Sequence, residues 1–176
     1  MACLALSVTA CGEPATVTVE PAPGCGVDGE LVAEIYGGFR ASIHWGPVDL
    51  QCEGMPRPDG EGARLRFSGL AGDAPGERQI AFIIGLPGLV RGETPSELPA
   101  NVTVIEEGAG RFFGTRGGAT CWTDIETHEK LPPAESSVYR ISGILYCVAP
   151  LADLGGKSSI SFADLQFSGR LNWETP

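Results

Sequence analysis

Few residues in this chain have the types and spacing that catalysis requires. A hydrolytic triad needs a nucleophile, a base and an orienting acid. The 176 residues contain only two histidines, His44 and His128, and no Gly-x-Ser-x-Gly motif. His128 lies among Glu126, Glu129 and Lys130 near a predicted hairpin loop, and His44 lies on the polar face of a predicted strand. We therefore interpret both histidines as solvated, and we expect a protein that is not an enzyme and uses no cofactor.

The tryptophans offer a different chemistry, because an aromatic ring on a polar strand face can stack on a ligand such as a sugar. Trp122 shares its predicted face with Asp124 and Glu126, which makes Trp122 and Asp124 candidates for ligand contact. Trp45 and Trp173 share their faces with aliphatic residues, a pattern that favours packing in the core.

Calcium is the metal that the carboxylates fit best. Asp59 and Glu61 place hard oxygen ligands in a loop with Gly60 and Gly62, so they are weak candidates for a calcium site. They match no defined calcium loop. The remaining acidic residues are scattered over predicted loops, and the sequence alone brings no two of them to the distance that glycoside cleavage requires. The sequence therefore predicts no firm metal site.

The composition limits the classes of partner and of fold. A formal charge of −10 argues against nucleic acid as a partner and against electrostatic binding to anionic lipid. The chain has 25 glycines and 14 prolines, yet it retains its valines, isoleucines and phenylalanines. This combination is typical of many short strands joined by many turns. At this length we expect one folded domain, residues 25–176.

The clearest strand is predicted at residues 165–173, where apolar or glycine positions alternate strictly with polar ones. The apolar phase slips between Phe162 and Leu165, which indicates a β-bulge or a change of sheet. Residues 150–157 are expected to hold one helical turn. About eight to ten strands in all favour an antiparallel β-sandwich. The predicted strands are residues 30–36, 41–45, 64–69, 80–86, 102–105, 111–115, 119–126, 138–148, 159–162 and 165–173.

Four of the six cysteines lie in the predicted domain, and they predict two disulfides formed in an oxidising compartment. A hairpin centred on Ala134 places Cys121 opposite Cys147, with both on apolar faces. A two-residue turn at residues 38–39 similarly places Cys25 opposite Cys52. These are the preferred bridges, the first better supported than the second, and the other two connectivities remain open.

The amino terminus is uncharged and mostly apolar over residues 1–10, and it runs into Val-Thr-Ala-Cys at residues 8–11. This stretch resembles the lipobox of bacterial lipoproteins. The resemblance implies that residues 1–10 belong to a signal segment, with a start further upstream, and that Cys11 carries the lipid. Gly12 after the cysteine implies the outer membrane. Residues 11–24, rich in proline, are expected to form a flexible tether.

These observations predict an exported, lipid-anchored envelope protein with a non-enzymatic binding or structural role. Its membrane contact would be the lipid on Cys11, and its partner an envelope protein or a glycan. The alternative is a carbohydrate- or calcium-binding sandwich module. In that case Trp122, Asp124 and the loop carboxylates would contact the ligand.

Overall fold

The computed structural model describes residues 24–72, 78–116, 120–134 and 136–174. The predicted signal segment, Cys11 and nearly all of the predicted tether lie outside these residues. The described chain is all-β and antiparallel, which confirms the predicted fold class, and it has eleven strands. They are β1 (Glu30–Gly37), β2 (Ala41–Trp45), β3 (Gln51–Pro56), β4 (Ala63–Ala71), β5 (Arg78–Leu86), β6 (Leu98–Glu106), β7 (Arg111–Gly114), β8 (Cys121–Lys130), β9 (Val138–Cys147), β10 (Leu151–Asp153) and β11 (Ser159–Asn172), with one 3₁₀ turn, η1 (Glu107–Ala109).

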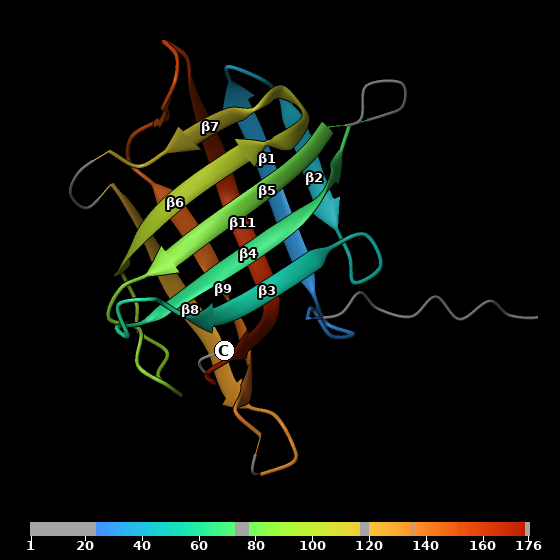
Figure 1. Ribbon diagram of the computed structural model, residues 1–176, viewed down its shortest axis with the longest axis vertical. Coiled ribbons are helices and arrows are strands. Elements are labelled where there is room, and N and C mark those ends of the chain that lie inside the picture. Colours follow the sequence, from blue (N-terminus) through green and yellow to red (C-terminus); the bar gives the residue numbers. More distant parts are fainter. Residues whose placement is uncertain (1–23, 73–77, 117–119, 135, 175–176) are drawn as a thin grey trace, which may run out of the picture.

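The strands form two layers that face each other across the core (Figure 1). One layer has the order β3-β4-β5-β6-β7, and the other has the order β2-β1-β11-β9-β8. Two connections join the layers along one side: β10 pairs with both β7 and β11, and the start of β6 pairs with β8. Among the described strands, β2 and β3 pair on one side only and form the open edges.

Strand β11 lies at the centre of its layer, as the regular alternation of residues 165–173 suggests. It pairs with β1 on one side and with β9 on the other. Leu165, Phe167 and Leu171 are buried, while the polar residues between them are exposed or half-buried. The pairing with β1 shifts register opposite Ala33, at the position where the apolar phase slips. The predicted β-bulge is confirmed, and it lets one strand continue from Ser159 to Asn172.

The core consists of aromatic and aliphatic side chains from both layers. Phe67 of β4 meets Phe167 of β11 with ring centroids 5.7 Å apart, and Phe82 of β5 contacts both Trp45 and Phe162. Burying one such side chain stabilises the fold by roughly 2–3 kcal/mol. Trp45 is 3 % exposed, so its predicted place in the core is confirmed.

Both preferred disulfides are present, Cys25–Cys52 and Cys121–Cys147. Cys121 and Cys147 face each other on neighbouring strands, in the register that was predicted. The register argument for Cys25–Cys52 was wrong, because β2 pairs one residue out of the predicted alignment, with Leu31 opposite Trp45. Cys52 belongs to β3, which pairs with β4, so this bridge links the segment before β1 to the opposite layer.

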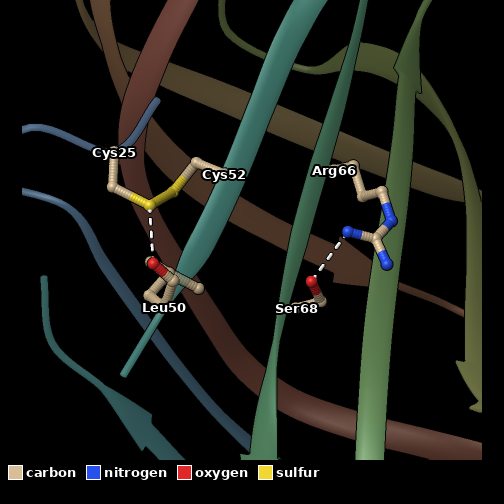
Figure 2. Close-up of a disulfide and its surroundings, with 5 residues drawn as sticks. All are labelled: Cys25, Leu50, Cys52, Arg66 and Ser68. Carbon is tan, nitrogen blue, oxygen red and sulfur yellow. Dashed lines mark hydrogen bonds between the residues drawn. A yellow bond between two sulfur atoms is a disulfide. The ribbon is translucent and has the colours of Figure 1, made fainter. Parts of the chain in front are cut away.

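Figure 2 shows this bridge beside the backbone carbonyl of Leu50. The carbonyl oxygen of Leu50 lies 3.0 Å from Cys25 Sγ. Since an oxidised sulfur carries no proton, this is a sulfur–oxygen contact without a donor hydrogen. In the same view, Arg66 Nη1 donates to Ser68 Oγ over 2.8 Å. Ser68 is fully buried, and this hydrogen bond satisfies its hydroxyl.

Two strands occur where the sequence predicted none. No strand was predicted between residues 45 and 64, but β3 forms there and pairs with β4 along its whole length. Residues 150–157 were expected to hold a helical turn, and instead Leu151–Asp153 forms β10. Both strands are short and lack regular alternation. Backbone pairing fixes both of them: β3 forms a hairpin with β4, and β10 pairs with β11 and with the distant β7. Local pattern does not reveal such pairing.

Candidate functional site

Trp122 of β8 and Tyr146 of β9 form the clearest aromatic surface in the described chain. The two residues face each other directly across the strand pair, with ring centroids 6.3 Å apart and planes 23° from parallel. Both rings are only half-buried. We call Trp122 and Tyr146 the aromatic platform. Because the stacked pair is only half-buried, part of the apolar surface of each ring remains open to solvent.

The strand pair beneath the platform holds the two rings in place. The adjacent pair along the ladder is the Cys121–Cys147 disulfide, whose Cα atoms are 4.0 Å apart. On the buried side, Thr123 Oγ1 donates to the carbonyl oxygen of Ile144 over 2.9 Å. Side chains alternate between the two faces of a strand, so buried Cys121 and Thr123 direct Trp122 outward. The predicted outward position of Trp122 is confirmed.

Two carboxylates flank the platform. Asp124 follows Trp122 by two residues on the same face of β8, as the sequence predicted. Its Oδ1 accepts a hydrogen bond from the backbone nitrogen of Glu97 over 2.7 Å, which leaves Oδ2 for other partners. The segment carrying Glu97 is fastened to β8 a second time, because Ile125 N donates to Pro95 O over 2.9 Å. Asp124 therefore brings a loop residue to the aromatic pair.

The backbone of Glu97 is strained. Its φ angle is +52°, and it is the one non-glycine residue with a positive φ in the described ranges. Left-handed backbone costs an L-residue with a side chain about 1 kcal/mol or more, and such strain concentrates at binding and catalytic sites. The bond from Glu97 N to Asp124 maintains this conformation. Strain and hydrogen bond together place the Glu97 side chain at the edge of the platform.

Glu97, Trp122, Tyr146 and Val148 line a hollow of about 350 Å³. Val148 is 74 % exposed, a high value for an aliphatic side chain, and it extends the apolar surface. Partial desolvation raises the pKa of Tyr146, and the negative charges of Asp124 and Glu97 raise it further. The Tyr146 hydroxyl therefore stays protonated and can donate a hydrogen bond. The hollow combines apolar surface, a hydroxyl donor and the carboxylate of Glu97, and the carboxylate of Asp124 lies on the same strand face.

The calcium candidates have a different environment. Asp59 Oδ2 accepts from Arg57 Nη2 over 2.6 Å, and Asp59 Oδ1 accepts from the backbone nitrogen of Glu61 over 3.2 Å. Both carboxylate oxygens thus have protein partners, one of them a cation. Within the residues that the structure describes, no three His, Cys, Asp or Glu side chains are grouped as metal ligands.

The two histidines differ sharply. His44 is exposed on the polar face of β2, as predicted, with Nε2 3.4 Å from Glu30 Oε1. The prediction of a solvated His128 was wrong, because this residue is only 3 % exposed. A bulge between Ile125 and Thr127 reverses the alternation of β8, so odd positions face inward before it and His128 faces inward after it.

The sequence reasoning missed two members of the site, Tyr146 and Glu97. Tyr146 could have been predicted from the sequence, since the hairpin register that pairs Cys121 with Cys147 also pairs Trp122 with Tyr146. Glu97 had no such signal. It lies in a loop, and its position depends on the tertiary contact with Asp124.

Comparison with known proteins gives no assignment: no family model, curated protein or solved structure matches the chain significantly. Within the described residues, no helix is long and apolar enough to cross a bilayer. The lipidation candidate Cys11 lies outside those residues.

Proposed function

We propose that this protein is an exported, lipid-anchored binding module of the bacterial envelope, without enzymatic activity, whose ligand is a glycan. The observation that carries the proposal is the aromatic platform with its two flanking carboxylates on a rigid, cross-linked strand pair. A sugar ring has an apolar C–H face and a rim of hydroxyls. The hollow offers matching partners for both, since the rings contact the face while Asp124 and Glu97 accept from the hydroxyls.

The charge at the site narrows the class of glycan. Asp124 and Glu97 create a negative potential at Tyr146, the same potential that raises its pKa. An anionic sugar such as a uronic acid would be repelled by this potential. A neutral sugar or one carrying a protonated amine would not be. The proposed ligand is therefore a neutral or amine-bearing pyranose within an envelope or extracellular polysaccharide.

A glycan array tests the proposal. The oxidised domain, residues 24–176, should bind a restricted set of neutral or amine-bearing glycans. In Trp122→Ala the array signal should fall about tenfold or more. The reason is that stacking one ligand ring on an aromatic side chain contributes on the order of 1–3 kcal/mol. Trp173→Phe is the matched control, since Trp173 is the other half-buried tryptophan and lies outside this hollow.

The same ligand should raise the melting midpoint of the wild-type domain and leave that of Trp122→Ala unchanged, because ligand that binds only the native state stabilises it. A domain that binds no neutral or amine-bearing glycan would contradict the proposal. Binding that survives in Trp122→Ala would contradict the assignment of the site.

The lipid anchor has its own support and its own test. The support is the lipobox-like stretch ending at Cys11, together with two disulfides of the kind that form in an oxidising compartment. Expressed in a bacterium from its complete gene, the wild-type protein should fractionate with membranes and carry a lipid on Cys11 in its N-terminal peptide. Cys11→Ser should move it to the soluble fraction. A wild-type protein found soluble with an unmodified Cys11 would overturn the anchor.

A further inference from the structure

A second hollow, of about 560 Å³, lies where the chain leaves β11 and β3 ends. It differs from the aromatic platform in that its lining contains two guanidinium groups and no carboxylate. We call it the arginine groove. Its lining residues are Met55, Pro56, Arg57, Pro58, Gly60, Arg91 and Trp173.

The indole of Trp173 is held at its edge by His128 and over one face by Arg91. Its Nε1 donates to His128 Nε2 over 3.2 Å, and His128 Nδ1 lies 3.0 Å from the carbonyl oxygen of Glu93. Because that carbonyl can only accept, the His128 proton resides on Nδ1 and Nε2 accepts from the indole. Burial lowers the pKa of His128, so the ring is neutral at pH 7. The buried histidine thus fixes the aromatic wall of the groove.

Arg91 lies over one face of Trp173. Its guanidinium carbon lies 5.4 Å from the indole centroid, a cation–π contact, and its Nη2 donates to the carbonyl oxygen of Trp173 over 3.3 Å. A guanidinium has five N–H donors, and this bond uses one. Arg91 has no ion pair with any described carboxylate. Its charge is therefore available to a ligand.

Arg57 supplies the second cation. It pairs with Asp59 through one Nη2–Oδ2 contact of 2.6 Å, which compensates part of its charge. Its remaining donors and the unpaired Arg91 leave the groove positive on a protein whose formal charge is −10. Apolar surface from Met55, Pro56 and Trp173 lies beside these donors. A planar fork of N–H donors matches the two oxygens of a carboxylate.

We propose that the arginine groove binds an organic carboxylate joined to an aromatic or apolar body. The carboxylate accepts from Arg91 and Arg57, and the body packs against Trp173, Met55 and Pro56. This site is separate from the aromatic platform, shares no lining residue with it, and selects the opposite charge.

Three small probes with one ring and different charges test this site: benzoate, benzyl alcohol and benzylammonium. The readout is the set of indole N–H resonances in ¹H–¹⁵N spectra of the full, oxidised chain, with Trp173 assigned through Trp173→Phe. Benzoate should shift the Trp173 resonance saturably and leave that of Trp122 in place. Benzyl alcohol should bind more weakly by up to about fivefold, since an exposed or half-exposed charge contact contributes up to about 1 kcal/mol.

Arg91→Met retains apolar bulk while removing the charge, and it should weaken benzoate binding by about fivefold with little effect on benzyl alcohol. Lys157→Met is the matched control. It removes the same charge from the loop before β11, whereas Trp173 follows the other end of that strand, so benzoate binding should not change. Equal affinity for benzoate and benzyl alcohol would overturn the proposal, as would benzoate binding that Arg91→Met leaves intact. A benzoate-induced shift confined to other tryptophans would do the same.

Discussion

The aromatic platform and the arginine groove each use a half-buried tryptophan at a strand end, but they surround it with opposite charge. Trp122 lies flat against Tyr146, with Asp124 and Glu97 beside the rings. Trp173 is stacked under Arg91 and tied to the buried His128. The comparison teaches that an indole ring provides a general apolar surface. The neighbouring charges determine which ligand that surface can accept.

The two regions also depend on different cross-links, and removing each disulfide gives the largest expected effect. The bridges span 27 and 26 residues, so the chain-entropy model assigns each about 3 kcal/mol. Cys121→Ser/Cys147→Ser should lower the free energy of unfolding by about that amount and weaken glycan binding at the adjoining platform. Cys25→Ser/Cys52→Ser should cost about the same and affect the groove instead, because Met55 follows Cys52 in β3. Denaturant unfolding measures the loss of stability, and titrations with the glycan and with benzoate measure binding at the platform and at the groove. If both variants lost affinity equally at both sites, the two sites would not depend on different disulfides.

Acid should destabilise the fold through His128, the residue that holds Trp173 in the groove. The folded-state pKa of His128 is lowered, so the unfolded chain binds a proton more readily. The stability that neutral His128 provides is therefore fully present above about pH 6.5. It is lost as pH falls below that value, by at most about 1.4 kcal/mol per pH unit, and the loss levels off below the folded-state pKa.

His128→Asn keeps a donor near the Glu93 carbonyl but does not titrate. The difference in unfolding free energy between the wild type and this variant, measured from pH 8 to pH 5, should shrink as pH falls. His128 also faces the ring of Tyr139 and the indole of Trp173. A difference that stays constant with pH would contradict the neutral, hydrogen-bonded state of His128.

Removing one platform charge should give a smaller change. Asp124→Asn retains an oxygen that can accept from Glu97 N but removes a negative charge near Tyr146. Because that charge raises the Tyr146 pKa, the variant should show a lower Tyr146 pKa, measured as the difference in tyrosinate absorbance from the same background with Tyr146→Phe. Glycan affinity should fall by a few-fold. An unchanged Tyr146 pKa would show that Asp124 does not act electrostatically at the platform.

The smallest expected effect concerns the strained loop. Glu97→Gly relieves left-handed backbone strain, but glycine loses more backbone entropy on folding. The net effect should be a rise of about 0.5 kcal/mol in the free energy of unfolding. It should also weaken glycan binding by removing a carboxylate. Ser96→Gly, next to it with no positive φ, should destabilise slightly. If both variants destabilise equally, the conformation of Glu97 is not under strain.

The sequence predicted features that depend on period and register. Alternation gave the fold class and the inward side of β11. The register of one hairpin predicted the Cys121–Cys147 bridge. The same register, extended by one residue, also pairs Trp122 with Tyr146. Asp124 was identified because it shares a strand face with Trp122. These relations are fixed by local geometry, so they can be derived from residue numbers alone.

Features that depend on irregular backbone or on distant contacts were missed. One bulge in β8 reversed the alternation and turned His128 inward, which no rule of strict period two anticipates. The Cys25–Cys52 pairing was correct although its argument assumed a register that β1 and β2 do not adopt. Glu97, Arg91 and Arg57 lie in loops, and only the packing of those loops against β8 and Trp173 brings them to their sites.

The central claim, that Trp122 and Tyr146 form a glycan-binding surface, is tested most directly at Trp122 itself. The measurement follows the three indole N–H resonances during titration with the glycan that gives the strongest array signal. We predict a saturable shift at Trp122, accompanied by the backbone amides of Tyr146 and Glu97, with Trp45 and Trp173 unchanged. A shift centred on Trp173, or none at Trp122 at saturating glycan, would contradict the claim.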